Sequence, residues 1–512
     1  MTHDVKPWPA LWSLIIGFFM ILIDTTIVSV ANPAILRGLH TDIDSVIWVT
    51  SAYLLAFAVP LLITGRLGDR FGPKNLYLIG LVIFTLSSAW CGFADSVGLL
   101  IAARVVQGVG GALMSPQTMA VITRIFPPER RGQALGLWGA TAGVATLVGP
   151  ILGGLLVDGF GWEWIFFVNV PIGVVAFVLA ARYVPALPTH SHRFDIPGVL
   201  LSAVGLFLLV FGIQEGQTYD WGVITGPITV WGLIVAGIVV LAGFVVQQAL
   251  TKREPLVPLH LFRDRNFSVA NVVITAVGFT VTSLSLPLVF YFQVVRGMTP
   301  TQSALMLAPM AVLNIGLAPV VGKLVDRMHP RLLAVPGLLL FSVALFLYSR
   351  MLSPDIAWGW LLLPAVVLGF ANALTWSPVS STATRGLAPR EAGAGSGIYN
   401  TTRQIGSVMG SAAVAVLIQA RLVADLPHRP GQSSSSDFTL DGSLPGFLHA
   451  GFTSAMAESL ILPASVVLVG AVAAAVFARP TMAAWQRPGA PAASAATPAE
   501  QRVPAAPEAD RP

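Results

Sequence analysis

Long apolar runs alternate with short polar segments along the chain, and this pattern predicts its elements. A run of about 20 apolar residues is long enough to cross a bilayer as a helix. Fourteen such runs occur, with these approximate limits: 10–33, 46–64, 76–94, 98–122, 133–157, 164–182, 196–213, 228–248, 268–292, 302–321, 332–350, 359–380, 397–418 and 459–478. The sequence therefore predicts an all-α polytopic membrane protein with 14 transmembrane helices.

The remaining segments predict connections and a tail. Segment 419–458 contains GQSSSSD and is predicted to be an irregular polar loop. The Ala/Pro-rich segment 481–512 is predicted to be a disordered cytoplasmic tail. The first apolar run is too long for the core of a signal peptide and many runs follow it, so we interpret it as a helix.

Composition supports the membrane assignment. The 512 residues are 55% hydrophobic and 10% charged, with a mean hydropathy of +0.77. A water-soluble domain carries about 25% charged residues, so the apolar excess indicates bilayer spans and not a large core. Cys91 is the only cysteine, so no intrachain disulfide is possible.

The placement of Lys and Arg predicts the orientation. If the N-terminus is cytoplasmic, 22 of the 29 basic residues fall in cytoplasmic segments and 5 in external loops. This bias follows the positive-inside rule. It predicts a bacterial inner (plasma) membrane protein with both termini in the cytoplasm, and it explains the net charge of +5 without a nucleic-acid partner.

Two segments recur within the chain. GRLGDRFGPK (65–74) returns as GKLVDRMHPR (322–331), and TRIFPPERRG (123–132) returns as TRGLAPREAG (384–393). Eight predicted helices separate equivalent positions, so the two copies have the same orientation in the membrane. We expect two parallel six-helix bundles with two helices inserted between them, divided as follows: 1–185, N-terminal bundle; 186–255, two additional helices; 256–480, C-terminal bundle; 481–512, tail.

Four motifs in order resemble the major facilitator superfamily, specifically its fourteen-helix drug:proton antiporter branch. They are LIDTTIVSVANP (22–33), GRLGDRFGPK (65–74), RVVQGVGGA (104–112) and GATAGVATLVGPILGG (139–154). The first motif usually reads Val-Ala-Leu-Pro at its end, and Asn32 departs from it. The resemblance implies the two-bundle fold, a gating role for 65–74, and a bend at 139–154 that helps to seal the pathway against proton leak.

Asp24 is the candidate proton site. It is the only acidic residue well inside a predicted span, and the other ionisable residues there are Arg104 and Arg403. At 1.5 Å per residue, Asp24 lies about 21 Å from the inner face and Arg104 about 9 Å from the outer face, so their depths coincide in a core of about 30 Å. Desolvation favours a protonated carboxyl and a neighbouring cation favours an ionised one. We therefore expect Asp24 to carry the coupling proton and Arg104 to tune it; a static ion pair is the alternative.

The segment 65–74 and its repeat 322–331 are candidate gates. A Gly-rich turn would bring Asp69 and Arg70 to a cytoplasmic helix end, where charges can pair or cap as the bundles rock. The alternative is a basic loop that only sets topology. The expected gating residues are Gly65, Asp69, Arg70, Gly72, Lys74, Asp326 and Arg327.

The fifth predicted span carries the antiporter-type motif. Glycines four residues apart permit close approach of membrane helices, and a proline can bend the helix. Simple packing is the alternative to a sealing role. The motif residues are Gly139, Gly143, Gly149, Pro150, Gly153 and Gly154.

Polar and aromatic residues in the spans are candidate cavity residues. Amides in spans also serve as interhelical hydrogen-bond partners, and Arg403 could instead reach the cytoplasmic face. The candidates are Asn32, Tyr53, Gln107, Asn271, Asn314, Asn372, Trp376 and Arg403.

These features predict a transporter and not an enzyme. The sequence has no Walker motif, metal-ligand cluster or catalytic constellation, so we expect no cofactor and energy from the proton gradient. The expected function is export of small amphipathic, neutral or monovalent compounds in exchange for protons by a monomer. The alternatives are a dedicated exporter of one endogenous metabolite or lipid, and a non-transporting membrane sensor.

Overall fold

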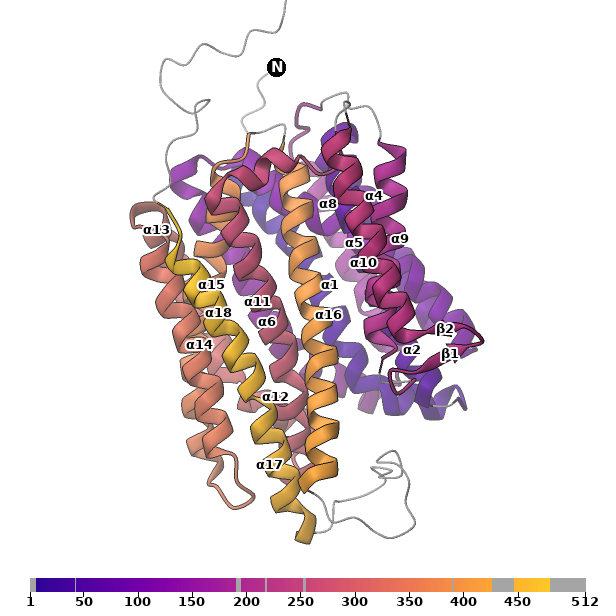
Figure 1. The fold of residues 1–512 in the computed structure, drawn as a ribbon. Helices are drawn as coiled ribbons and strands as arrows, with labels where there is room; N and C mark the ends of the chain where they lie inside the picture. The colour runs from indigo at the N-terminus through magenta and orange to yellow at the C-terminus, as the bar shows by residue number, and fades with distance from the viewer. Residues whose placement is uncertain are drawn as a thin grey trace, which may run out of the picture.

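The computed structural model is a bundle of long helices that run roughly parallel to one another (Figure 1). It describes residues 6–41, 43–189, 195–216, 219–251, 255–388, 391–425 and 446–478. Within these residues, 12 helices are long and apolar enough to cross a membrane, and a bent helix pair raises the number to 13. The prediction of an all-α polytopic membrane protein is therefore confirmed. The predicted tail, 481–512, lies outside the described residues.

The first half of the chain forms an N-terminal bundle. Its helices are α1 (Pro7–Gly38), α2 (Ile43–Ala58), α3 (Leu61–Phe71), α4 (Pro73–Gly92), α5 (Val97–Ile125), α6 (Pro128–Phe160), α7 (Trp164–Phe167) and α8 (Asn169–Tyr183). The second predicted span is the pair α2 and α3, bent by 46° at Val59–Pro60. The fifth predicted span lies within α6, whose apolar segment, Val148–Phe160, is shorter than a full span.

The second half forms a C-terminal bundle. Its elements are η1 (Leu259–Arg263), α11 (Arg265–Phe290), η2 (Tyr291–Val295), α12 (Pro300–Met306), α13 (Ala308–Arg327), α14 (Arg331–Met351), η3 (Trp358–Leu361), α15 (Leu362–Arg385), α16 (Ala392–Asp425), η6 (Gly446–Leu448), α17 (His449–Ser459) and α18 (Ile461–Ala475). The predicted polar loop over 419–458 is wrong at both ends, since α16 continues to Asp425 and α17 begins at His449.

In the sequence, the two bundles are connected by α9 (Ile196–Gln214), a short hairpin of β1 (Val223–Thr225) and β2 (Ile228–Thr229), and α10 (Val230–Leu250). The two helices pack on each other and lie along one side of the molecule, beside α2 and α16 (Figure 1). Asp195 accepts hydrogen bonds from Gln247 (3.0 Å) and Gln248 (2.6 Å), which joins the start of α9 to the end of α10.

The two bundles meet mainly through α6 against α13 and α15, and through α3 and α5 against α16. Close contacts such as Gly65 with Gly393 and Gly322 with Gln133 lie toward the end of the molecule where α1 begins and where α3, α5 and α13 end. We call this end the basic face, after Arg66, Arg124, Lys323 and Arg327, and the opposite end the distal face. One large apolar cluster spans both bundles and includes Phe18, Trp138, Trp376 and Tyr399.

Candidate functional site

Asp24 lies inside the N-terminal bundle and is fully buried. One carboxylate oxygen, Oδ2, contacts Nη1 of Arg104 at 2.5 Å, and both side chains are 0% exposed. Asp24 comes from α1 and Arg104 from α5, so the two residues that the sequence placed at one depth do contact each other. Within the described chain, the Asp24 carboxylate points at protein groups and not at lipid.

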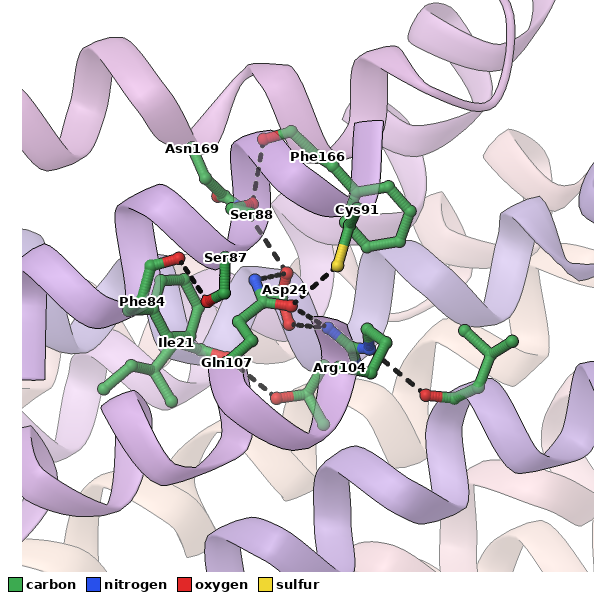
Figure 2. A network of polar contacts seen from close by, with 12 residues as sticks. Ile21, Asp24, Phe84, Ser87, Ser88, Cys91, Arg104, Gln107, Phe166 and Asn169 are labelled. Atoms are coloured by element: carbon green, nitrogen blue, oxygen red, sulfur yellow. Dashed lines mark hydrogen bonds and ion pairs between the residues drawn. The ribbon is translucent and has the colours of Figure 1, made fainter. Parts of the chain in front are cut away.

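Two amides complete the coordination of the carboxylate (Figure 2). Its second oxygen, Oδ1, accepts hydrogen bonds from Nε2 of Gln107 (2.9 Å) and from Nδ2 of Asn169 (3.1 Å). The Gln107 carbonyl accepts a hydrogen bond from Nη1 of Arg104 (2.7 Å), and Asn169 also donates to Ser88 (3.0 Å). Three helices therefore meet at one carboxylate, α1, α5 and α8, and α4 joins the network through the bond between Ser88 and Asn169.

Arg104 is held on its other sides as well. Its Nε donates to the Val49 carbonyl at 3.1 Å, and its guanidinium carbon lies 4.0 Å from the centre of the Tyr53 ring. Such a cation–π contact stabilises a desolvated guanidinium. Nη2 of Arg104 is buried and has no hydrogen-bond partner among the described residues. The Arg104 charge is therefore compensated by Asp24 but not fully hydrogen-bonded.

The network has one consequence for proton chemistry. Removing one partner of a buried ion pair leaves the other charge uncompensated in a dry environment, at a cost of about 3–5 kcal/mol. Protonation of Asp24 would do the same to Arg104. Protonation is therefore compatible only with a rearrangement that gives Arg104 another partner, such as water or an anionic group.

The sequence did not reveal Asn169. This residue begins α8 in the segment FFVNVPIG, where an amide in an apolar run stands directly before Val-Pro. That position was the available signal, but an amide has many potential partners in a bundle. Tyr53 and Gln107 were expected in a substrate cavity, and the structure places both beside Asp24 and Arg104.

Asp69 joins the bundles at the basic face. Its carboxylate contacts Nη2 of Arg124 at 2.5 Å within the N-terminal bundle. It also accepts hydrogen bonds from the backbone N–H groups of Gly393 and Ala394, both at 3.1 Å, at the start of α16 in the opposite bundle. A carboxylate at a helix N-terminus binds unpaired N–H groups and the positive end of the helix dipole.

Asp326 makes the matching contact from the other bundle. Its Oδ1 accepts a hydrogen bond from the backbone N–H of Gly132 at 3.0 Å, near the start of α6. The Ser377 hydroxyl donates to the Gly132 carbonyl at 2.7 Å. Glycine permits this close approach, because a Cβ on Gly322 would lie 2.4 Å from Cα of Gln133.

The gate segment 65–74 is not the loop that was expected. Gly65, Asp69 and Arg70 lie in the last turns of α3, and only Gly72, with φ of 89°, separates α3 from α4. Short connections are common between antiparallel membrane helices, and one glycine in the left-handed region suffices for the turn. Lys74 donates to the Ala181 carbonyl at 2.7 Å, and Arg327 ends α13.

The α6 motif packs against both bundles. A Cβ on Gly149 would meet Thr26, and one on Gly153 would meet Ile27, so these glycines bring α6 close to the α1 segment that carries Asp24. The remaining motif positions lie along the same helix: Gly139 faces Trp376, Gly154 faces Thr301, Pro150 is inside α6, and Gly143 belongs to α6 with no described surroundings.

The other cavity candidates are spread over both bundles. Asn271 accepts a hydrogen bond from Thr402 (2.9 Å), and Asn372 accepts one from Nε1 of Trp376 (3.0 Å), which are interactions within the C-terminal bundle. Asn314 is buried and Asn32 is half-buried, and each has a buried amide atom that finds no hydrogen-bond partner within the described part of the chain. Arg403 is half-buried on α16, and its Nε has no partner among the same residues.

Two bundles of long apolar helices, with a buried ion pair inside one of them, are typical of polytopic membrane transport proteins. The chain belongs to the Major Facilitator Superfamily, whose family model matches residues 14–411. The prediction of a non-enzymatic transporter is confirmed by this membership. Transporters of this superfamily carry small molecules, often with protons, typically work as monomers and generally need no cofactor.

Curated relatives and a solved structure agree with this assignment. An uncharacterised MFS-type transporter of Mycobacterium tuberculosis is 50% identical over 92% of this chain and 80% of its own length. The tetracenomycin C resistance and export protein of Streptomyces glaucescens is 33% identical over 93% of this chain and 92% of its own. The structure of the proton:xylose symporter XylE superposes with a TM-score of 0.61 at 14% identity, covering 91% of this chain and 94% of XylE.

Proposed function

We propose that this protein is a proton-coupled antiporter that exports small amphipathic compounds across the bacterial inner membrane. Drug-resistance and export proteins among its relatives support the export direction and the substrate class. The basic residues support an orientation with the basic face in the cytoplasm. In this proposal the proton gradient supplies the energy, no cofactor takes part and one chain is the working unit.

The observation that carries the proposal is the setting of Asp24. A carboxylate that is 0% exposed within a helix bundle, and that contacts Arg104 at 2.5 Å, is expensive to place in a membrane and marks a functional site by default. A carboxylate that only braced the bundle could be replaced by apolar packing at little cost. We assign Asp24 as the proton acceptor and Arg104 as the group that competes with the proton for it.

The coupling follows from the two bonding arrangements that Asp24 allows. With the pair intact, the charges of Asp24 and Arg104 cancel, and no proton is carried. When the site opens to the external side, water or substrate can replace Asp24 as the partner of Arg104. Asp24 can then bind a proton. Return of the pair on the cytoplasmic side releases the proton, so each cycle moves about one proton per titrating carboxylate.

The contacts at the basic face serve as the cytoplasmic gate in this proposal. Asp69 and Asp326 hold helix N-termini of the opposite bundle, and the bundles must separate there to admit a cytoplasmic substrate. The α6 glycines keep that helix close to α1 and so limit water entry beside Asp24. The contacts of Gly149 and Gly153 with α1 support this sealing role.

The test is a substrate-triggered pH change in proteoliposomes that contain the purified chain. With the native protein, addition of the drug should release protons from acid-loaded vesicles. With Asp24→Asn it should not. Equal proton movement in the mutant contradicts the assignment of Asp24. A resistance panel of unrelated drugs separates a multidrug exporter from an exporter of one metabolite or lipid, and a sensor gives no proton movement with any compound.

A further inference from the structure

Arg403 is a charged side chain for which the proposed proton site has no use. It lies on α16, 11 residues beyond Ala392, or about 16 Å along the helix at 1.5 Å per residue. The predicted span on this helix begins near residue 397, so Arg403 lies about 9 Å inside the hydrocarbon core. A cation at that depth is costly unless it meets a counter-ion or a polar space.

The described residues contain no counter-ion for it. No carboxylate in the described part of the chain lies within ion-pair distance of Arg403, and its buried Nε has no hydrogen-bond partner. Asp24, the acidic residue well inside a predicted span, is engaged by Arg104, Gln107 and Asn169. The positive end of the α16 dipole lies toward the basic face, so it adds to the charge of Arg403 and does not offset it.

Arg403 shares a face of α16 with a residue of the apolar cluster that spans both bundles. Tyr399, one helical turn earlier on the same face of α16, belongs to the apolar cluster that also contains Trp138 from the opposite bundle. Between Arg403 and the basic face, α16 is packed against the opposite bundle, because Gly393 and Gly397 lie directly on Gly65. Arg403 as a residue is nevertheless half-buried and not fully enclosed.

Several buried polar atoms on this stretch of α16 have no hydrogen-bond partner among the described residues. Nε of Arg403 can only donate, and Oδ1 of Asn400 can only accept. The hydroxyls of Tyr399 and Ser396 are also buried without a partner, and they can donate as well. A ligand with acceptor oxygens satisfies Nε of Arg403 and these hydroxyls, whereas a cationic ammonium group would repel the guanidinium.

From these observations we infer that the exported compounds are amphipathic anions, with a carboxylate, sulfonate or acidic phenolate group that binds Arg403 between the two bundles. This inference rests on the proposed export function and specifies its substrate charge. A guanidinium binds such oxygens in a bidentate manner. The membrane potential, negative inside, also favours outward movement of an anion.

The test is equilibrium dialysis with matched radiolabelled probes and the purified chain in detergent, which requires no transport. The probes are 1-naphthalenesulfonate, 1-naphthyltrimethylammonium and neutral 1-naphthalenemethanol, together with the corresponding anthracene compounds. We expect the sulfonates to bind at least about tenfold more tightly than the ammonium compounds. Tighter binding of the cations, equal binding of all three charge types, or no binding of any probe overturns the inference.

Variants assign the preference to Arg403. Arg403→Gln should reduce sulfonate affinity by about tenfold or more and leave the affinity for the neutral probe within about twofold, while Arg403→Lys should keep part of the sulfonate preference. Arg421→Gln is the matched control, because Arg421 lies on the same helix but pairs with Glu458 at 2.8 Å and is 46% exposed. Unchanged sulfonate binding in Arg403→Gln contradicts the assignment. The proton assay with Asp24→Asn is separate, so the two proposals can fail independently.

Discussion

Asp69 and Asp326 stand at matching positions of the two repeated segments, and each binds the beginning of a helix in the opposite bundle. Asp69 accepts the N–H groups of Gly393 and Ala394 on α16, and Asp326 accepts the N–H of Gly132 on α6. The sequence repeat is therefore also a repeat of one contact. At the basic face, a carboxylate of each bundle thus accepts a backbone hydrogen bond from the first turns of a helix in the other bundle.

Loss of either carboxylate should loosen the basic face. A helix-capping carboxylate contributes about 1–2 kcal/mol, and a change of that size shifts an equilibrium about 5- to 30-fold. We expect Asp69→Asn and Asp326→Asn each to speed maleimide labelling of a cysteine at position 394 by that factor. The background is Cys91→Ala with Ala394→Cys, since Ala394 is 2% exposed.

The control for this experiment is Arg265→Gln. Arg265 lies on the same face, but its Nε donates to the Val476 carbonyl at 2.8 Å within one bundle, so labelling should stay at the background rate. If Asp69→Asn labels no faster than Arg265→Gln, the carboxylate does not hold the bundles together.

The Asp24–Arg104 pair should show strong thermodynamic coupling. Asp24→Asn or Arg104→Gln alone leaves one buried charge unpaired and should destabilise the protein by about 3–5 kcal/mol. The double variant removes both charges and should lose much less than the sum of the two single changes. Thermal unfolding of the four proteins in detergent measures this; additive losses would show that the two side chains do not depend on each other.

The close approach of α6 to α1 should tolerate no side chain at Gly149. A Cβ there would lie 1.9 Å from Oγ1 of Thr26, whereas a Cβ at Gly159 on the same helix meets nothing within 4 Å. Gly149→Ala should therefore lower the thermal midpoint, and Gly159→Ala should leave it unchanged or raise it, since alanine favours a helix by about 1 kcal/mol over glycine. Similar midpoints for the two variants would argue against tight packing at this crossing.

Most of the fold could be predicted from the apolar pattern of the sequence. Runs of about 20 apolar residues located the spans because a bilayer requires helices of that length. Connections were less predictable. Gly72 alone forms the turn between α3 and α4, and the polar composition of 65–74 is typical of a loop although most of this segment is helix.

The proton site was predictable in part. An acid and a base at one depth suggested Asp24 with Arg104, because helix rise converts sequence position into depth. Rotation of each helix about its axis is set by packing, so the sequence did not show that Asn169 and Gln107 would bind the same carboxylate. For the same reason it left open whether Arg403 reaches the cytoplasmic face or the space between the bundles.

The most direct test of the central claim compares two kinds of uptake into proteoliposomes, with a radiolabelled compound to which the native chain confers resistance. One uptake is driven by a pH gradient, and the other is substrate exchange without a gradient. Native protein should show both. Two variants should retain exchange and lose the response to the pH gradient. They are Asp24→Asn and the double variant Asp24→Asn/Arg104→Gln, in which no charge is left unpaired. A folded variant without Asp24 that still accumulates substrate along the pH gradient would contradict the account.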